Sequence, residues 1–251
     1  MASTPSGLTE TEDEAIVFGT VAYGESDLIV RLYSQHNGRF SLFARGAKKS
    51  RKRFPSGISF LSRGLIRWKT RRGDGLGELL ETDFRGGFEG IGTDPYSYGR
   101  AAYIVEILER LTPEAEPDSV TFQVLTTILS ALACHEADSR HLRVFELLLL
   151  KQTGYLPDEL NGAPGVSGIA AFDPQTGAFS MEREPGMLPF TDADRNAAIA
   201  LLSAPLDELP AIDSHCLKAI SRLFAAHLRQ MDVWPLKSMT FWRSLSHGVK
   251  P

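Results

Sequence analysis

The first part of the chain alternates apolar and polar residues in short runs that are typical of β-strands. Five such runs are rich in β-branched and aromatic residues, and turn residues such as Asn37-Gly38 separate them. The expected strands are residues 15–23, 28–33, 39–44, 60–69 and 77–82. Five short strands within residues 14–90 match the size of the five-stranded oligonucleotide-binding (OB) barrel. We therefore predict an OB barrel in this region.

From about Asp94 onward the apolar residues recur at the spacing of helices, and capping residues such as Ser139 mark where helices begin. The expected helices are residues 95–111, 119–132, 139–153, 193–203 and 217–231. Residues 154–190 are dense in Gly and Pro, which predicts an irregular insert with a hairpin near residues 172–179. The fold class is therefore α+β, in which the N-terminal barrel is followed by an all-helical domain over residues 91–251.

Residues 1–13 are polar and acidic, and we expect them to form a disordered tail. They lack the basic start and the apolar core of a secretory signal peptide. The longest strongly apolar stretch, residues 144–150, contains Glu146 and is much shorter than the roughly 20 apolar residues of a membrane helix. We therefore expect a cytoplasmic protein that does not bind membranes.

The charges of the chain are strongly segregated. The net charge is −4, but residues 31–72 carry thirteen Lys and Arg and no Asp or Glu, which leaves −17 on the remainder. Like charges crowded on one small domain repel one another, so the asymmetry indicates a polyanionic partner. Six of the cations lie in residues 45–53, where they interrupt the strand pattern. We expect this run to be a solvated loop on the barrel.

Nucleic acid is the polyanion that a basic OB barrel predicts, because phosphates would neutralise cations that lack counter-charges. Aromatic rings between the cations can stack on bases. Alternation predicts that Phe43 points inward, and we expect Phe54 or Trp68 to be exposed for stacking. The candidate nucleic-acid-binding cations are Arg31, Arg39, Arg45, Lys48, Lys49, Arg51, Lys52, Arg53, Arg67, Lys69, Arg71 and Arg72. The plain alternative is a charged loop that only keeps the protein soluble.

Sequence patterns for catalysis or metal binding are absent. The six His have no H-x-H spacing, and Cys134 and Cys216 are not part of any C-x-x-C motif. The glycine-rich residues 73–77 precede a strand and not a helix, so they lack the geometry of a phosphate-cradling loop. We therefore expect no catalytic residue, no metal, no cofactor and no small-molecule substrate.

Six short motifs occur in a fixed order along the chain. They are Tyr23-Gly24-Glu25-Ser26-Asp27, Gly38-Arg39, Ala44-Arg45-Gly46-Ala47-Lys48-Lys49, Arg143-Val144-Phe145-Glu146, Gly154-Tyr155-Leu156-Pro157 and Pro235-Leu236-Lys237-Ser238. Each motif is weak alone, but together their order and spacing resemble the bacterial RecO family of recombination mediators. The resemblance covers nearly the whole chain from Glu14.

The resemblance implies an OB barrel, a helical C-terminal domain and non-enzymatic work in DNA repair and recombination at the bacterial nucleoid. Proteins of this family bind single- and double-stranded DNA, anneal complementary strands and associate with RecR. They also contact the C-terminal tail of the single-stranded DNA-binding protein and help to load RecA onto coated DNA. For this chain the resemblance therefore implies DNA, RecR and this tail as partners, with RecA as an indirect one.

We expect the helical domain to receive the tail of the single-stranded DNA-binding protein, because an acidic peptide with a terminal carboxylate needs an apolar groove edged by cations. The candidate contacts are Arg143, Lys151, Arg222 and Arg229. Many members of the family carry a four-cysteine zinc ribbon in the insert, whereas residues 154–190 of this chain contain no Cys. Zinc is therefore not expected.

Two other functions remain open. An RNA-binding OB adaptor in RNA processing or ribosome assembly would prefer RNA over DNA of equal length. A nucleotidyl transferase with Lys48 or Lys49 as nucleophile would need a nucleotide pocket, and no motif in the sequence supplies one.

Overall fold

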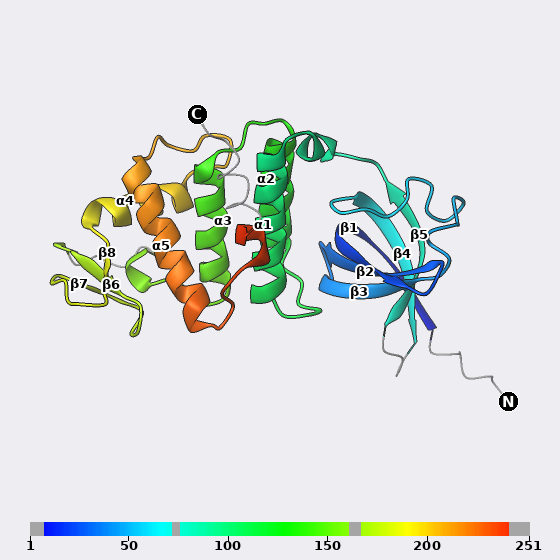
Figure 1. The fold of residues 1–251 in the computed structure, drawn as a ribbon, viewed down its shortest axis with the longest axis horizontal. Coiled ribbons are helices and arrows are strands. Elements are labelled where there is room, and N and C mark those ends of the chain that lie inside the picture. Colours follow the sequence, from blue (N-terminus) through cyan, green and yellow to red (C-terminus); the bar gives the residue numbers. More distant parts are fainter. Residues whose placement is uncertain (1–7, 72–75, 161–166, 241–251) are drawn as a thin grey trace. The chain divides into compact units, whose positions relative to one another are not determined.

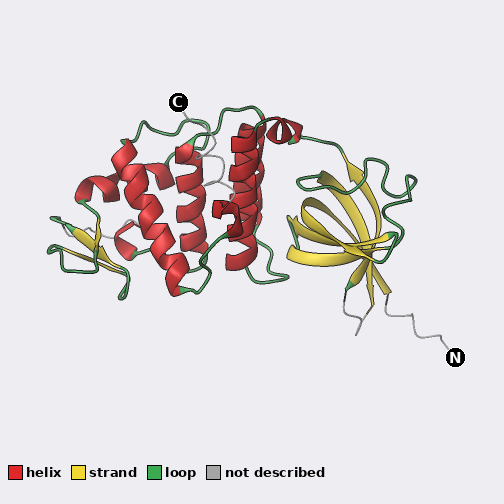
Figure 2. Cartoon of the chain, viewed as in Figure 1, coloured by secondary structure: helices red, strands yellow, loops and turns green. Residues whose placement is uncertain are grey.

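A computed structural model describes residues 8–71, 76–160 and 167–240 (Figure 1). The chain divides into two compact units. The first unit consists of the residues up to Gly90 together with Thr112–Thr126. The second consists of Ile91–Leu111 and the residues from Thr127 onward. The first contains a five-stranded sheet, and the second contains most of the helices (Figure 2).

The five strands of the first unit close into a barrel. They are β1 (Leu8–Tyr23), β2 (Asp27–Ser34), β3 (Gly38–Ala44), β4 (Arg63–Arg71) and β5 (Gly77–Phe84). They pair in the order β1-β2-β3-β5-β4 and back to β1. All pairs are antiparallel except β3 with β5. This OB-like arrangement confirms the fold predicted for the N-terminal part of the chain.

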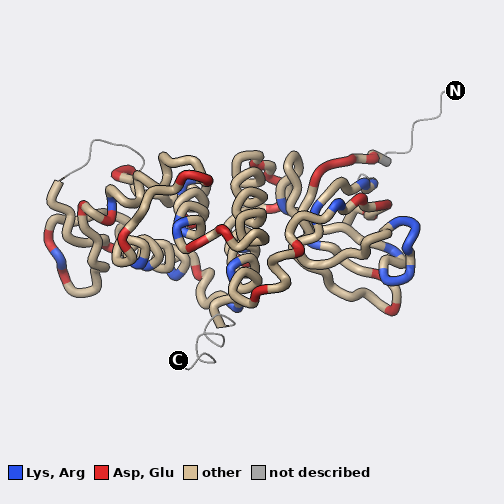
Figure 3. Tube along the Cα trace, turned by 90° about the horizontal axis from the view of Figure 1, so that it is seen from above, with Lys and Arg blue, Asp and Glu red and all other residues tan. Residues whose placement is uncertain are grey.

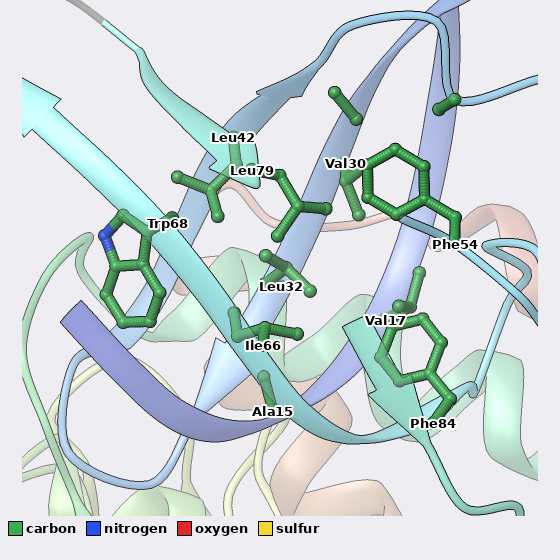
Figure 4. Close-up of a cluster of buried hydrophobic side chains, with 12 residues drawn as sticks. Ala15, Val17, Val30, Leu32, Leu42, Phe54, Ile66, Trp68, Leu79 and Phe84 are labelled. Carbon is green, nitrogen blue, oxygen red and sulfur yellow. The ribbon is translucent and has the colours of Figure 1, made fainter. Parts of the chain in front are cut away.

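Alternate residues of the strands fill the barrel (Figure 4). The labelled core residues are Ala15, Val17, Val30, Leu32, Leu42, Phe54, Ile66, Trp68, Leu79 and Phe84. The predicted exposure of Phe54 or Trp68 is wrong, because Phe54 is 0% and Trp68 is 5% exposed. Trp68 lies two residues after the buried Ile66 and therefore points to the same face of β4. Neither ring is accessible for stacking on a base.

β1 begins earlier than expected. Residues 8–13 were predicted to belong to a disordered tail, but they form the start of β1 and pair with β4. In this register Glu10 lies opposite Lys69 and Glu12 lies opposite Arg67, and such cross-strand pairs stabilise a strand that has few apolar residues. The rest of the predicted tail, residues 1–7, lies outside the described residues.

Residues 112–116, which follow the helix over residues 95–111, pack against the start of β3. Gly38 has a φ of +66°, and a Cβ atom there would overlap the carbonyl oxygen of Glu116. The Arg39 side chain donates to the carbonyl oxygen of Thr112 at 3.2 Å and to the Glu114 carboxylate at 3.0 Å. The close approach of the two backbones therefore requires the glycine of the Gly38-Arg39 motif.

The helices are α1 (Pro95–Leu111), α2 (Ser119–Ala133), α3 (Ser139–Gln152), α4 (Asp192–Ser203) and α5 (Ser214–Gln230), with short 3-10 helices η1 (Glu89–Thr93) and η2 (Asp158–Leu160). These bounds lie close to the predicted ones. The cap of α3 differs, because Asp138 and not Ser139 accepts the first backbone N–H, that of Arg140, at 2.8 Å. No helix among the described residues is long and apolar enough to cross a membrane.

The insert contains the predicted hairpin. β6 (Ala171–Asp173) pairs with β7 (Ala178–Ser180), and β8 (Leu188–Pro189) adds a third strand on the other side of β6. The rings of Phe172 and Phe179 lie directly across this hairpin, with their centroids 5.4 Å apart. Within the described part of the insert, ring packing and strand pairing hold the sheet together. Residues 161–166 lie outside the described residues.

Candidate nucleic-acid interface

The cationic run lies on a loop between β3 and β4, which we call the basic loop (residues 45–57). Two apolar side chains anchor this loop, because Ala47 and Phe54 are both buried in the barrel core. The residues between the two anchors include the exposed Lys48, Lys49, Arg51 and Lys52. In Figure 3, Lys and Arg are concentrated on this loop. The two anchors thus determine which side chains face solvent.

Backbone hydrogen bonds hold the basic loop in one conformation. The N–H groups of Lys49 and Ser50 donate to the carbonyl oxygen of Gly46 at 3.0 and 2.9 Å. The N–H of Phe54 donates to Ser50 at 3.2 Å, and that of Thr82 on β5 donates to Arg53 at 3.0 Å. The cations are therefore displayed on a preorganised backbone, which lowers the entropy lost on binding.

A turn between β1 and β2 holds the beginning of the basic loop. The Asp27 carboxylate accepts the N–H of Gly46 at 2.7 Å, and Ser26 accepts the N–H of Lys48 at 3.0 Å. The Lys48 ammonium donates to the carbonyl oxygen of Gly24 at 3.3 Å. The bond from Gly46, the Ser26 hydroxyl and attraction to the nearby cations lower the pKa of Asp27. The RecO-like motifs of residues 23–27 and 44–49 are thus in direct contact.

Carboxylates neutralise most of the cations on β4. The ion pairs are Arg63–Glu14 at 2.7 Å, Arg67–Glu81 at 2.9 Å, Arg67–Glu10 at 3.4 Å and Lys69–Glu78 at 3.1 Å. These acidic residues come from β1 and β5, the two strands that flank β4. The expectation that residues 31–72 lack counter-charges is therefore wrong, because strand pairing brings acidic residues from outside this segment.

Other candidate cations make contacts within the protein. Arg39 pairs with Glu114, and Arg45 lies 3.8 Å from Glu78. Arg53 donates to the carbonyl oxygen of Arg45 and lies over the buried ring of Phe54. The Arg31 side chain lies over Gly19, its cross-strand neighbour on β1. The Arg71 side chain and Arg72 lie outside the described parts of the structure.

Four cations of the basic loop have no carboxylate partner among the described residues. Within the described parts of the chain, no carboxylate lies within 4 Å of the cationic groups of Lys48, Lys49, Arg51 and Lys52. Lys52 lines a surface hollow of about 290 Å³, which Glu12, Glu81 and Asp83 also line. The charges of these carboxylates offset those of the cations in the hollow. The excess positive charge therefore lies on the exposed part of the basic loop.

Phe43 points outward, so its predicted inward orientation is wrong. Phe40, Leu42 and Ala44 face the barrel core, and the alternation along β3 leaves Phe43 on the outer face. There the rings of Tyr23 and Phe43 meet in a T-shaped arrangement, with the centroids 5.3 Å apart and the planes at 83°. Sequence reasoning missed this pair. The alternation of Leu42 and Ala44 could have indicated it, because two core-facing residues on either side of Phe43 place Phe43 on the opposite face of the strand.

The four candidate peptide contacts in the helical unit differ in their exposure to solvent. Arg143 is only 12% exposed and donates to the Glu146 carboxylate at 2.7 Å, so it does not form the edge of an exposed groove. Lys151 on α3 and Arg222 and Arg229 on α5 are exposed. Arg229 also lies over the Trp234 ring, 4.7 Å from its centroid. Of the four candidates, Arg143 is therefore the least accessible to a peptide.

Glu146 lies at the centre of a buried polar cluster. It accepts hydrogen bonds from Arg143 and from the hydroxyl of Tyr103, the latter at 2.6 Å. Burial raises the pKa of Glu146 to about 7, although Arg143 and Tyr103 oppose this increase. Among the described residues, no group of three or more His, Cys, Asp and Glu is placed to hold a metal ion. The cluster thus has a structural role in joining α1 to α3.

Comparison with known proteins agrees with this geometry. Residues 8–88 match the model of the family described as Recombination protein O N terminal, and residues 92–240 match Recombination protein O C terminal. The chain belongs to the RecO family. This confirms the resemblance found in the sequence motifs, and the family is one of DNA repair and recombination proteins.

Three relatives named DNA repair protein RecO illustrate the similarity. The protein of Myxococcus xanthus is 35% identical over 159 residues, which cover 61% of this chain and 65% of the relative. That of Pelobacter propionicus is 33% identical over 144 residues, covering 57% and 58%. That of Syntrophotalea carbinolica is 28% identical over 248 residues, covering 94% and 95%. The chain thus spans less than two thirds of the first two relatives and nearly all of the third.

Proposed function

We propose that this chain is a DNA-binding recombination mediator whose basic loop binds the phosphates of single- and double-stranded DNA. The observation that carries the proposal is the excess charge on Lys48, Lys49, Arg51 and Lys52, which have no carboxylate within 4 Å in the described chain. Phosphates would supply the missing counter-charges. Membership of the RecO family supports DNA as the polyanion.

Strand annealing follows from the same charges. Cations that neutralise the phosphates of two strands lower the repulsion between them, so that complementary bases can meet. Because Ala47 and Phe54 anchor the basic loop, the cations need little rearrangement to reach phosphates. This work requires no covalent step, and we propose a non-enzymatic protein.

We further propose that the protein acts with RecR and helps to load RecA onto DNA coated by the single-stranded DNA-binding protein. The exposed cations of α5, Arg222 and Arg229, are suited to the acidic tail of the coating protein, with Lys151 as a further candidate. A strand-annealing assay with bare and coated DNA tests this role. A mediator anneals both, whereas a simple DNA-binding protein anneals only bare strands.

The central experiment compares two double variants that remove the same charge from the barrel. Lys48→Gln/Lys49→Gln removes two cations without ion-pair partners, whereas Arg67→Gln/Lys69→Gln removes two that are paired with carboxylates. The affinity for single-stranded DNA is measured over a range of salt concentrations. Each lost phosphate contact flattens the slope of log affinity against log salt by about 0.7. We expect a change of about 1.4 for the loop variant and a smaller change for the β4 variant.

Two results would contradict the proposal. Equal flattening in both variants would show that the basic loop is not the main site. Tighter binding to RNA than to DNA of equal length and sequence would favour an RNA-binding adaptor.

A further inference from the structure

A cluster of apolar side chains is exposed on the outer face of the barrel. Tyr23 is 58% exposed and Val21, on the same face of β1, is 52% exposed. Strand pairing places Ile29 of β2 between Val21 and Phe43. We call Val21, Tyr23, Ile29 and Phe43 the aromatic patch. Contiguous exposed apolar groups of this kind commonly mark a binding surface.

The fold covers this face near Tyr33 but leaves the aromatic patch open. Further along β2, the outward-facing Tyr33 is buried between two rings. Its centroid lies 5.5 Å from that of Phe18 and 6.3 Å from that of Phe122, with the planes nearly parallel. The residues that cover Tyr33 do not extend over Tyr23, whose ring contacts only that of Phe43 among the described aromatic rings.

Cations surround the aromatic patch. The guanidinium of Arg45 lies 5.9 Å from the centroid of Phe43. The Lys48 ammonium contacts Gly24, which directly follows Tyr23 in the chain. Arg31 is the next outward-facing residue after Ile29 on β2. An exposed ring, Tyr23, and a half-buried ring, Phe43, bordered by cations match a ligand that combines flat apolar groups with regularly spaced negative charges.

We propose that Tyr23 and Phe43 form a stacking platform for unpaired bases, beside the phosphates held by the basic loop. This inference rests on the proposed DNA-binding function and assigns the base-binding residues of that site. A single strand can turn its bases onto rings, whereas a duplex keeps its bases stacked inside. The platform therefore gives the protein a preference for single strands that phosphate contacts alone do not supply.

The test compares an ordinary single strand with an abasic strand of equal length, which has the phosphates but no bases. The variants are Tyr23→Ser and Phe43→Leu, which remove a ring, with Val120→Ser as a control that removes an exposed apolar side chain outside the aromatic patch. We expect the wild type to bind the ordinary strand more tightly. Loss of one ring lowers that affinity by about 5- to 100-fold and leaves the affinity for the abasic strand unchanged. Val120→Ser keeps the preference for bases.

A second measurement reports stacking directly. An oligonucleotide that contains 2-aminopurine loses fluorescence when its base stacks on a ring, and we expect this quenching to weaken in Tyr23→Ser and Phe43→Leu. Ring variants that retain both the full preference for bases and the quenching would overturn the platform. In that case a flattened salt slope in Lys48→Gln/Lys49→Gln would still support the phosphate site, so the two failures are distinguishable.

Discussion

The backbone N–H of Gly46 donates a hydrogen bond of 2.7 Å to the carboxylate of Asp27. This contact joins the turn before β2 to the beginning of the basic loop. Gly46 has a φ of +59°, a left-handed conformation that glycine adopts readily and that sets the direction of the chain after Gly46. The Asp27 carboxylate therefore contributes to the cationic site, because its bond to Gly46 positions the cations that follow Gly46.

Two variants of Asp27 separate its hydrogen bond from its charge. Asp27→Asn keeps an acceptor oxygen and removes the negative charge, so we expect DNA affinity to stay equal or rise. Asp27→Ala removes both, and the loosened basic loop should bind DNA several-fold more weakly than the Asn variant. Affinity for one oligonucleotide at constant salt is the measurement. Equal affinities of the Ala and Asn variants would show that the bond does not position the loop.

Gly38 and Gly24 form a matched pair for testing the close backbone contact at β3. Both have positive φ values, +66° and +61°, but a Cβ at Gly38 meets the Glu116 carbonyl, whereas one at Gly24 has no atom of the described structure within 4 Å. Gly24→Ala should cost only about 1–2 kcal/mol for the left-handed conformation. Gly38→Ala should cost more, and the difference in free energy of unfolding by urea measures the clash. Equal losses of unfolding free energy in the two variants would mean that the contact between Gly38 and Glu116 adjusts to the added Cβ without an energetic cost.

The stability of the protein should depend on pH through Glu146. Because burial raises the pKa of Glu146 from 4.5 to about 7, the folded state binds a proton that the unfolded state has already lost. This contribution is fully present below pH 4.5 and is lost as the pH rises to about 7, which amounts to roughly 3 kcal/mol. Urea unfolding over this range should show the decline in wild type.

Two variants isolate the pH effect. Glu146→Gln cannot ionise, so the decline in stability should disappear. Glu182→Gln changes an exposed carboxylate and should leave the decline in place. An unchanged pH dependence in Glu146→Gln would show that another buried group is responsible.

Arg143 and Arg222 should have different roles despite their equal charge. Arg143→Ala removes the cation that bonds Glu146, whose carboxyl then stays protonated at neutral pH, and should lower stability by roughly 1–3 kcal/mol for the lost hydrogen bond. Arg222→Ala should leave stability unchanged and weaken binding of a peptide with acidic residues and a terminal aromatic carboxylate. Thermal unfolding and titration of the labelled peptide measure the two effects. Peptide affinity that falls only in the basic-loop variant would show that peptide and DNA share one surface.

The insert should hold its structure without zinc. The rings of Phe172, Phe179 and Phe190 pack in succession, with centroid distances of 5.4 and 5.0 Å. We predict that elemental analysis of protein purified without chelator finds no stoichiometric zinc, and that a chelator leaves the melting temperature unchanged. One zinc per chain would contradict this prediction. Phe179→Ala, in contrast, should lower the melting temperature because it removes the central ring.

Local patterns in the sequence were sufficient to predict most elements of the fold. Turn residues such as Asn37-Gly38 act on their immediate neighbours, and so do caps such as Asp94, whose carboxylate accepts the backbone N–H of Ser97 at 2.8 Å. Such residues therefore mark the ends of strands and helices without knowledge of the rest of the chain. The start of β1 escaped this reasoning. Its acidic residues form a strand only because Arg67 and Lys69 lie opposite them in the folded barrel.

The sequence by itself determined that the barrel carries a cationic segment, because composition along the chain does not depend on folding. Only the tertiary structure decided which of these cations remain without counter-charges. The register of β1 and β5 against β4 pairs Arg67 and Lys69 with carboxylates, while the buried Ala47 and Phe54 turn Lys48 and Lys49 toward solvent. The orientation of rings was likewise decided by the barrel, since closure of the sheet determines which face of each strand becomes the core.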